Sequence, residues 1–301
     1  MPELPEVETI RAGLARHVLD ATVVGLDIRR DSALRRQDGG RTEFTDRLLG
    51  CHFTAAVRRG KFLWLTLSGA DEVAAALVIH LGMSGQLRLG SPPSSHSRIR
   101  FDLSFPDGRT EVLDFVDQRT FGYVAVRDLV PTADGLPGGL GSDRPQVPDL
   151  AAHIARDLLD PHLDRTDLVH RIRARQTGIK RALLDQELVS GIGNIYADEA
   201  LWRAGLHYAR AAHRLRSAEV NRLLDHASEV MNESLAAGGT TFDELYVNVD
   251  GDAGYFARAL AVYGRTGANC PRCDTPIVRE AFMNRSSFRC PRCQRPPRTR
   301  R

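Results

Sequence analysis

The first residues of the chain combine a potential nitrogen nucleophile with an acid. The chain begins Met1-Pro2-Glu3, and proline is a second residue small enough for the initiator methionine to be removed. Removal would leave the secondary amine of Pro2 at the terminus, and an amine that attacks a sugar carbon forms a Schiff base. The pKa of a terminal amine, roughly 7.7–8.0, needs only a modest decrease for the amine to be neutral at physiological pH. Glu3 lies beside this amine and could relay protons.

A helix is expected directly after these residues. Pro5 suits the first turn of a helix, and apolar residues then recur at three- and four-residue spacing on one face: Val7, Ile10, Leu14 and Val18. The positive end of this helix would disfavour a second positive charge on Pro2. The alternative is an ordinary capped surface helix, which the N-terminal residues taken alone favour.

The clearest metal-binding pattern is near the other end of the chain. It consists of two Cys-x-x-Cys pairs, formed by Cys270, Cys273, Cys290 and Cys293. Paired motifs of this kind are typical of a tetrahedral structural zinc site, whereas disulfides, the alternative, are rare in a reducing compartment. Four protein ligands leave no open position, so we expect one structural Zn²⁺ ion. Cys51 has no such partner and is expected to be a small buried hydrophobic residue.

Almost all basic residues of the chain are arginines, so its two lysines stand out. Of the 41 lysine and arginine residues, only Lys61 and Lys180 are lysines. An amine is difficult to replace with a guanidinium where a proton must be transferred, so a lysine in an arginine-rich chain is a candidate for chemistry. The alternative for each lysine is retention by chance.

Two glycine-containing turns carry side chains that could enter a DNA duplex. Met83 stands in H-L-G-M-S-G, while Arg119 and Phe121 stand in D-Q-R-T-F-G, and both stretches follow predicted strands. Exposed methionine, phenylalanine and arginine side chains can fill the space that an extruded nucleotide leaves in a duplex. Taken alone, Met83 and Phe121 fit buried core positions better.

A second group of residues could contact phosphate. Residues 191–194, G-I-G-N, are expected to form a turn at the start of a helix, where backbone N–H groups and the Asn194 amide can bind an anion. A simple helix cap is the alternative. Arg175 and Lys180 precede this turn and could add positive charge. Arg285 is expected at a hairpin tip between the two cysteine pairs, either in reach of DNA or simply solvated.

Composition sets the broad class of the protein. A chain of 301 residues is long enough for two domains with cores of their own. No apolar run approaches the roughly 20 residues of a membrane span, and the acidic N-terminus is unlike a secretory signal. We therefore expect a cytoplasmic protein with no membrane partner. The net charge of +3 is only a weak indication of nucleic acid binding.

The pattern of apolar residues changes along the chain. Short apolar runs separated by turn signals, such as residues 22–30 and 62–67, predict a β-sandwich or barrel. Residues 31–43, rich in arginine, aspartate and glycine, are expected to form a loop. Proline and glycine in residues 131–148 predict a linker, after which helical spacing takes over. The chain is therefore expected to be a multidomain α+β protein.

The motifs quoted above, together with M-P-E-L-P-E-V-E-T and N-R-S-S-F, resemble those of formamidopyrimidine-DNA glycosylases in family order over essentially the full chain. The resemblance implies an N-terminal β-sandwich with an N-terminal helix, and a C-terminal helix–two-turn–helix module plus a zinc ribbon. The implied domains are a catalytic domain at 2–130, a linker at 131–149, a helical DNA-binding domain at 150–264 and a zinc ribbon at 265–301.

The resemblance also implies an activity. Members of this family flip out and excise oxidised purines, namely 8-oxoguanine and formamidopyrimidines, and then cleave the abasic strand by β- and δ-elimination. Pro2 would be the nucleophile, Glu3 would pass protons to the sugar, Lys61 would assist elimination, and Arg285 would act late at a phosphate. The expected partner is double-stranded DNA that contains oxidised purines or abasic sites, bound by a monomer.

Further residues would contact the DNA. By resemblance, Met83, Arg119 and Phe121 fill the void, with Arg119 facing the orphaned cytosine. Contacts with the rest of the DNA are expected from His96, Arg175 and Asn194. Where relatives often have a basic residue this chain has Gln176. The loop at residues 250–256 would read the damaged purine, and the alternative for it is an interdomain linker.

Two other functions compete with this prediction. The related endonuclease VIII type shares the terminal amine and the zinc ribbon but prefers oxidised pyrimidines. Its members usually begin Pro-Glu-Gly-Pro-Glu, so Leu4 argues against it, as do Arg119 and Phe121. The second competitor is a DNA-binding module without catalysis, which would need neither Pro2 nor Lys61.

Overall fold

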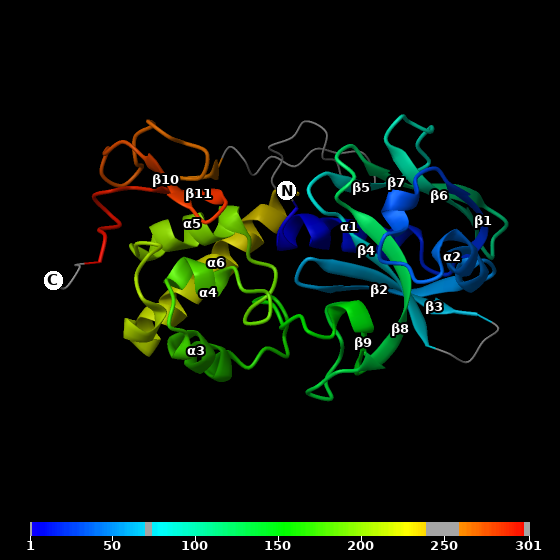
Figure 1. Cartoon of the computed structure of the whole chain (residues 1–301), viewed down its shortest axis with the longest axis horizontal. Coiled ribbons are helices and arrows are strands. Elements are labelled where there is room, and N and C mark those ends of the chain that lie inside the picture. Colours follow the sequence, from blue (N-terminus) through cyan, green and yellow to red (C-terminus); the bar gives the residue numbers. More distant parts are fainter. Residues whose placement is uncertain (1, 70–73, 239–258, 298–301) are drawn as a thin grey trace. The chain divides into compact units, whose positions relative to one another are not determined.

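The structure, a computed structural model, describes residues 2–69, 74–238 and 259–297 (Figure 1). These residues divide into two compact units, and the division along the chain lies between His153 and Ile154. The second unit ends its first segment at Ala236 and resumes in the described residues after position 258. In the described part of the chain no helix has the length and apolar character needed to cross a bilayer.

The first unit contains an N-terminal helix, α1 (Leu4–His17), and a ladder of antiparallel strands. In chain order these strands are β1 (Thr22–Ile28), β2 (His52–Arg59), β3 (Phe62–Ser68), β4 (Ala75–His80), β5 (Gly85–Leu89), β6 (Ser97–Ser104), β7 (Thr110–Asp117), β8 (Tyr123–Pro131) and β9 (Gln146–Pro148). Their spatial order is β5-β7-β6-β1-β2-β3-β4-β8-β9. A short 3₁₀ helix, η2 (Asp149–Ala151), follows β9.

This ladder folds back on itself as a β-sandwich, which confirms the predicted class. Strand β1 pairs with β2 only at Thr22 and His52, while it pairs with β6 along its whole length. The ladder can therefore bend between β1 and β2. Side chains from both parts of the ladder share one apolar core, among them Leu87, Phe101, Phe115, Leu65, Ile79 and Val124.

Helix α1 forms where the proline and the apolar spacing predicted it. Its apolar residues Val7, Ile10 and Leu14 are buried in the core of the sandwich. The helix begins with a capping box, in which the side chains of Glu3 and Glu6 accept hydrogen bonds from each other's backbone N–H groups. One face of α1 is therefore an integral part of the core.

The loop predicted for residues 31–43 is wrong. The segment contains a 3₁₀ helix, η1 (Asp31–Leu34), and the start of helix α2 (Gly40–Leu48). Phe44 and Leu48 lie four residues apart on one face of α2 and are fully buried against the sandwich. The preceding residues are mostly arginine, aspartate and glycine, so the sequence pattern indicates a loop rather than a helix.

Residues 131–148, for which we predicted a linker, are held to the first unit by backbone hydrogen bonds. Leu140 exchanges both of its backbone hydrogen bonds with Arg58 of β2, at 2.9 and 3.0 Å, and β9 pairs with β8. A Cβ atom at Gly139 would overlap the carbonyl of Arg58, so the glycine permits this close approach. The domain boundaries given above stay a prediction.

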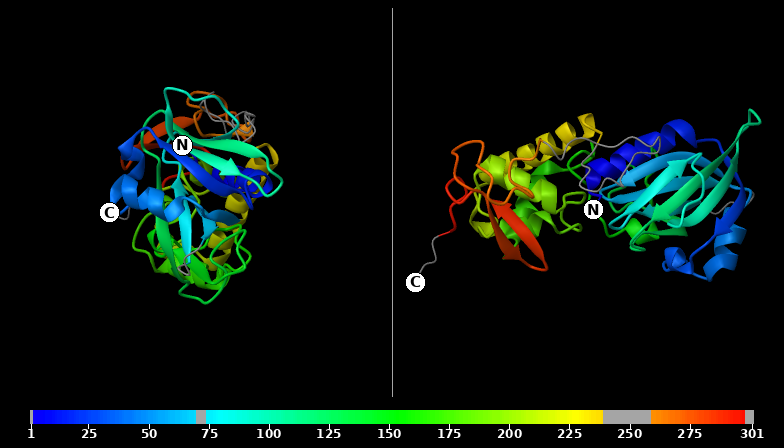
Figure 2. Two further views of the ribbon diagram at one scale, coloured as in Figure 1. Left: turned by 90° about the vertical axis from the view of Figure 1, so that its right-hand side faces the viewer. Right: turned by 90° about the horizontal axis from the view of Figure 1, so that it is seen from above.

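The second unit consists of helices and a β-hairpin (Figures 1 and 2). Its elements are α3 (Arg165–Ala174), α4 (Ile179–Leu183), α5 (Asn194–Ala204), η3 (Ala212–Arg214), α6 (Ser217–Ala236), β10 (Val278–Phe282) and β11 (Arg285–Arg289). Apolar residues continue at helical spacing to Leu188 in the sequence, but α4 ends at Leu183. The turn before α5 contains Gly191 with φ +87°, a backbone conformation that favours glycine. Helices precede a cysteine-rich hairpin, as the sequence predicts.

Candidate functional site

The terminal residues Pro2 and Glu3 are buried immediately before α1. The Glu3 carboxylate is held at the start of the helix by the backbone N–H of Glu6, and the Glu6 carboxylate accepts the Glu3 N–H at 2.8 Å. These contacts fix the direction of the Glu3 side chain. The positive end of α1 therefore directly follows the predicted nucleophile.

Lys61 lies in the turn between β2 and β3, and a buried ion pair ties this turn to α1. Arg58 is fully buried, and its Nε donates a hydrogen bond to Glu8 Oε2 at 2.9 Å. Its Nη1 donates to the carbonyl of Gly60 at 3.2 Å, next to Lys61. Glu8 also accepts hydrogen bonds from Arg11. The structure thereby links the Lys61 turn to the first turns of the helix that follows Pro2.

Breaking this ion pair should destabilise the first unit strongly. Arg58→Met keeps the apolar length of the side chain but removes the fully buried partner of Glu8, which stays paired with Arg11. A buried charge left unpaired costs about 3–5 kcal/mol, and because Arg11 still pairs with Glu8 the loss should be about 2–3 kcal/mol. Urea unfolding followed by the fluorescence of Trp64, on a Trp202→Phe background, measures the change. Arg29→Met is the control, because the Arg29–Asp27 pair is exposed and should contribute no more than about 1 kcal/mol. Equal losses in the two variants would contradict the assignment.

The two predicted void-filling turns present their side chains to solvent. Met83 is 37% exposed and Phe121 is 54% exposed, and Arg119 is also exposed. The alternative that Met83 and Phe121 are core residues is therefore wrong. Both turns follow strands of the sandwich, Met83 after β4 and Arg119 after β7.

Asp117 fastens these two turns to each other. Its Oδ1 accepts hydrogen bonds from the Ser84 hydroxyl at 2.6 Å and from the Arg119 N–H at 3.2 Å. Its Oδ2 accepts the Gly122 N–H at 2.6 Å. A Cβ atom at Gly82 would overlap the Phe121 carbonyl, so the glycine allows the turns to touch. Sequence reasoning missed Asp117, although it opens the D-Q-R-T-F-G stretch and short acidic side chains commonly organise turns.

His96 joins the same end of the sandwich. It is half-buried in the turn before β6, and its carbonyl accepts the Asp117 N–H at 2.9 Å. The structure therefore brings His96 next to the strand end that leads to Arg119 and Phe121.

His80, at the end of β4, supports the Met83 turn. Its ring stacks on Tyr123 with centroids 5.1 Å apart, and its Nδ1 accepts the Gly82 N–H at 3.2 Å. Burial, and to a lesser extent the positive charges of Lys61, Arg35 and Arg36, lower the pKa of His80 to about 4. The imidazole is therefore neutral at pH 7, with the hydrogen on Nε2.

This pKa predicts a loss of stability in acid. Because the pKa of His80 is about 4 in the fold and 6.5 without it, the unfolded chain binds the proton first as the pH falls. The stabilisation present above pH 6.5 is then lost between pH 6.5 and 4, by roughly 2 kcal/mol between pH 7 and 5. His80→Asn keeps an acceptor near Nδ1 but does not titrate, so its unfolding free energy should fall less over this range. Parallel pH profiles of the two proteins would contradict the prediction.

In the second unit, α5 contacts the hairpin tip. Asn194 is the first residue of α5, and its Nδ2 donates a hydrogen bond to the carbonyl of Ser286 at 2.9 Å. Arg285, the neighbour of Ser286, is exposed at the start of β11. The Asn194 side chain is buried at this contact.

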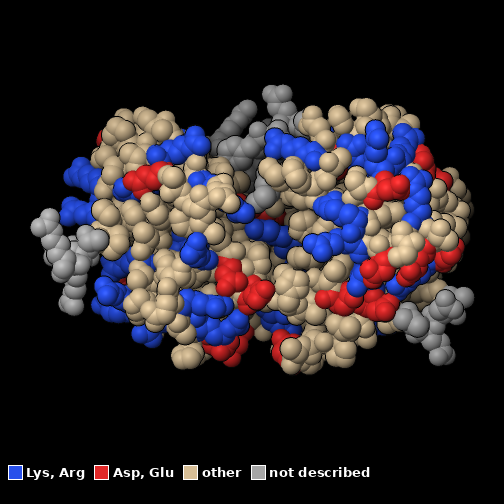
Figure 3. All heavy atoms as spheres, in the orientation of Figure 1, with Lys and Arg blue, Asp and Glu red and all other residues tan. Residues whose placement is uncertain are grey.

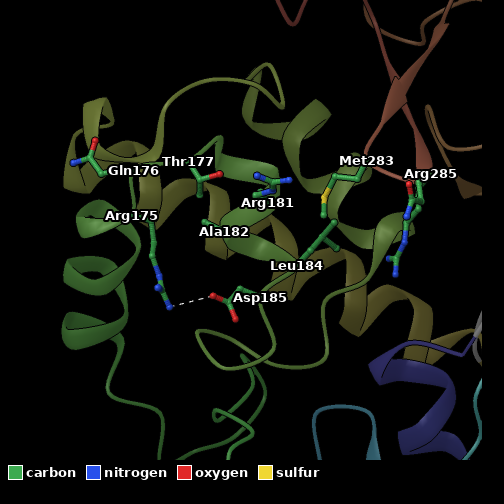
Figure 4. A pocket seen from close by; sticks show the side chains of 10 residues that line it. Arg175, Gln176, Thr177, Arg181, Ala182, Leu184, Asp185, Met283 and Arg285 are labelled. Carbon is green, nitrogen blue, oxygen red and sulfur yellow. Dashed lines mark ion pairs between the residues drawn. The ribbon is translucent and has the colours of Figure 1, made fainter.

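Three arginines line a cavity of about 580 Å³ between the α4 region and the hairpin tip (Figure 4). They are Arg175, Arg181 and Arg285. Arg175 forms an ion pair with Asp185 at 3.1 Å, which holds its guanidinium at the cavity. The predicted contacts Arg175 and Arg285 therefore share one basic surface with Arg181, which sequence reasoning missed. Gln176 lines the same cavity. Basic side chains are spread over the visible surface of both units (Figure 3).

The expectation that Lys180 contacts phosphate is wrong. Its side chain is fully buried, and its Nζ lies 2.7 Å from Asp198 Oδ1. Asp198 also accepts hydrogen bonds from the Ser287 hydroxyl and the Phe288 N–H, both at 2.9 Å. Burial raises the pKa of Asp198 to about 6, against the lowering effect of Lys180. Lys180 thus helps to hold the hairpin against α5.

The four cysteines of the hairpin region have the geometry of a zinc site. Their ligand atoms all lie within 4.8 Å of one another, and Cys270 and Cys290 are fully buried. The sulfur atoms of Cys273 and Cys290 are 3.4 Å apart, and those of Cys270 and Cys293 are 4.0 Å apart. Sulfur atoms about 2.3 Å from a tetrahedral zinc ion lie about 3.8 Å apart, so the cluster fits one Zn²⁺. The site is structural, with cysteine at every position.

Residues 250–256, for which we predicted a base-reading loop, lie outside the described residues. Just after them, Glu199 of α5 accepts hydrogen bonds from three successive backbone N–H groups, those of Ala261, Val262 and Tyr263, at 2.8–3.0 Å. The chain is thereby anchored to α5 where the described residues resume.

Comparison with known proteins identifies the family. Residues 1–124 match the formamidopyrimidine-DNA glycosylase N-terminal domain, residues 154–245 match its H2TH domain, and residues 269–296 match a zinc finger found in FPG and IleRS. A formamidopyrimidine-DNA glycosylase of Mycobacterium sp. (strain JLS) is 52% identical, with 100% of both chains covered. One of Kineococcus radiotolerans is 53% identical, with 99% of both covered.

Solved structures agree with this result. The MutM (FPG) protein of Thermus thermophilus is 35% identical and superposes with a TM-score of 0.78 over 97% of this chain and 98% of that one. A Lactococcus lactis FPG mutant in complex with a Fapy-dG containing DNA is 26% identical, with a TM-score of 0.81 over 98% of this chain and 100% of that one. Since family models cover both units and the curated relatives span the whole length, the chain belongs to the formamidopyrimidine-DNA glycosylase family.

Proposed function

We propose that this chain is a bifunctional DNA glycosylase of base-excision repair. It flips 8-oxoguanine and formamidopyrimidines out of double-stranded DNA, removes them, and cleaves the abasic strand by β- and δ-elimination. Membership of the family supports the glycosylase activity, and relatives have been solved with abasic-site and Fapy-dG DNA. The observation that carries the proposal in this chain is the pair of exposed turns that Asp117 fastens together, because a base-flipping enzyme needs such groups to fill the void.

The chemistry begins at the terminus. The neutral amine of Pro2 attacks C1′ of the damaged nucleotide, the bond from C1′ to the base breaks, and the departing base takes a proton from water. The Glu3 carboxylate, fixed by the capping box, accepts the proton that the attacking nitrogen loses and passes it to the sugar oxygen as the ring opens. The product is an iminium between Pro2 and C1′, which makes the hydrogens on C2′ acidic.

Elimination follows from this iminium. Removal of a C2′ proton expels the 3′ phosphate, and a second elimination expels the 5′ phosphate, so that a one-nucleotide gap remains. Lys61 lies in a turn anchored to α1 through Arg58 and Glu8, and it assists these proton transfers near the phosphate. Arg285 stabilises the phosphate that leaves late in the reaction.

The remaining candidates bind DNA. Met83 and Phe121 occupy the space of the extruded nucleotide, and Arg119 contacts the orphaned cytosine. His96, Arg175 and Asn194 contact the phosphate backbone, so affinity should fall steeply as salt rises. Arg175 sits on the arginine-lined cavity of the second unit, and the zinc site holds the hairpin that carries Arg285.

Borohydride trapping tests the proposal. The mature protein is mixed with duplex DNA that contains 8-oxoguanine opposite cytosine, and borohydride reduces any iminium to a stable adduct. An adduct that maps to Pro2 is expected. Trapping only with oxidised thymine would instead assign the protein to the endonuclease VIII type, and tight binding without any adduct would show a DNA-binding module without catalysis.

A further inference from the structure

We propose that Arg35 is a positioning residue, which holds the turn of Arg119–Phe121 in the shape needed to fill the void. The inference rests on the proposed glycosylase function and extends it to a residue more than eighty positions away in the sequence. Arg35 directly follows η1 and its side chain is exposed. It reaches the turn as a fork of two hydrogen-bond donors.

Arg35 contacts the turn through two of its backbone carbonyl groups. Its Nη1 donates a hydrogen bond to the Gly122 carbonyl at 2.5 Å, and its Nη2 donates to the Phe121 carbonyl. Nη1 also donates to the Ser32 carbonyl at 3.0 Å, which ties the side chain to its own segment. The guanidinium lies 5.1 Å from the centre of the Tyr123 ring, in a cation–π contact.

Asp117 and Arg35 hold opposite polar groups of the same turn. Asp117 accepts the N–H groups of Arg119 and Gly122, while Arg35 donates to the carbonyls of Phe121 and Gly122. The backbone is therefore fixed from both sides, and neither contact uses the side chain of Arg119 or Phe121. Those side chains are left exposed for DNA.

The conformation of the turn explains why it needs such support. Thr120 has a φ of +57°, in the left-handed region that β-branched residues strongly disfavour. A turn with this strain persists only when surrounding contacts enforce it. Without the Arg35 fork, Thr120 can relax and Phe121 moves away from the position from which it enters the duplex. In the described residues Arg35 makes no hydrogen bond to the N-terminal residues or to the turn of Lys61. Pro2, Glu3 and Lys61 should therefore keep their positions when Arg35 is replaced.

The consequence differs between two substrates. Excision of 8-oxoguanine requires a stacked base to be extruded and its space to be filled, which costs a few kcal/mol of unstacking. A preformed abasic site has no base to unstack, yet it is cleaved by the same amine and the same eliminations. If Phe121 is no longer held in position, excision of 8-oxoguanine should slow, whereas cleavage of an abasic site should not.

Single-turnover assays on Arg35→Met and Arg35→Lys test the proposal. Methionine removes both donors, and lysine keeps the charge but cannot bridge two carbonyls as a fork. For both variants, excision of 8-oxoguanine opposite cytosine should slow roughly 10- to 100-fold, the range for loss of a charge-assisted hydrogen bond. Cleavage of an abasic duplex should change less than about threefold by the same reasoning, since no base is extruded.

Arg36→Met is the matched control, because Arg36 is an exposed neighbour of equal charge whose side chain makes no described hydrogen bond. It should leave both reactions within about twofold, the small effect expected of a solvated charge. Equal slowing on both substrates, recovery in Arg35→Lys, or an Arg36→Met effect as large as that of Arg35→Met would overturn the proposal. Failure of the unmodified protein to excise 8-oxoguanine would instead refute the glycosylase function itself.

Discussion

Replacing Pro2 with glutamine should abolish the covalent adduct with 8-oxoguanine DNA. Glutamine in second position is too large for the initiator methionine to be removed, so the nitrogen of residue 2 becomes an amide and cannot attack C1′. The rate of strand cleavage should fall by at least about three orders of magnitude, as it does when enzymes lose a nucleophile. Borohydride trapping and single-turnover cleavage measure the loss, and mass spectrometry establishes which residue begins the chain.

The matched control is Pro2→Gly. Glycine is small, so the methionine can leave and a primary amine takes the place of the secondary one. This variant should retain a trapped adduct, formed more slowly, because a primary amine can still form an imine. DNA affinity in a non-cleavable duplex should be equal in the two variants, since Pro2 acts on the sugar. If Pro2→Gln still forms an adduct, the nucleophile is another residue, with Lys61 the first to test.

Loss of one zinc ligand should release the hairpin that carries Arg285. Cys290 is fully buried, and its backbone N–H donates to Gln294 Oε1 at 3.0 Å within the cluster. Metal binding supplies roughly 10–16 kcal/mol to modules of this size, so a ribbon that loses a ligand should unfold. Cys290→Ser should contain less than one equivalent of zinc, expose the hairpin amides to rapid hydrogen exchange, and bind DNA at least about tenfold more weakly through lost phosphate contacts.

Cys51→Ser is the control for this experiment. Cys51 lies in the first unit, outside the cluster, where its thiol donates to the Arg47 carbonyl at 3.3 Å. The substitution should leave the zinc content and the exchange of the hairpin amides unchanged. A chelator should reproduce the effect of Cys290→Ser in the unmodified protein. Full zinc content in Cys290→Ser, or a protected hairpin after chelation, would refute the structural role of the metal.

The amino-acid sequence alone determined the elements whose signals are local. The Cys-x-x-Cys spacing predicts the zinc site because four ligands on two short turns can surround one ion without help from the rest of the fold. Alternating apolar residues predict the sandwich, and the spacing after Pro5 predicts α1, because each pattern follows from the geometry of a single element. The proposed terminal amine of Pro2 also depends only on the first residues, because the size of the second residue decides whether the methionine can be removed.

Features that depend on contacts between residues far apart in the sequence could not be predicted in this way. The sequence treats Lys61 and Lys180 alike, yet Lys180 is fully buried against Asp198 while Lys61 lies in a half-buried turn. Met83 and Phe121 are apolar and fit a core, and only the packed sandwich leaves them exposed. Helix α2 was missed because two apolar residues are too few to define a period, although they suffice to dock a helix once the sheet exists.

The residues that hold the candidate site in place also depend on contacts between distant segments. Asp117, Arg35 and the Glu8–Arg58 pair act through hydrogen bonds between segments 33 to 87 positions apart. No periodicity or short motif encodes such a contact, because the pairing exists only after the strands have set the register of both segments. The sequence therefore determined which groups could do the chemistry, and the tertiary structure decided which of them are exposed, which are buried and what holds them in place.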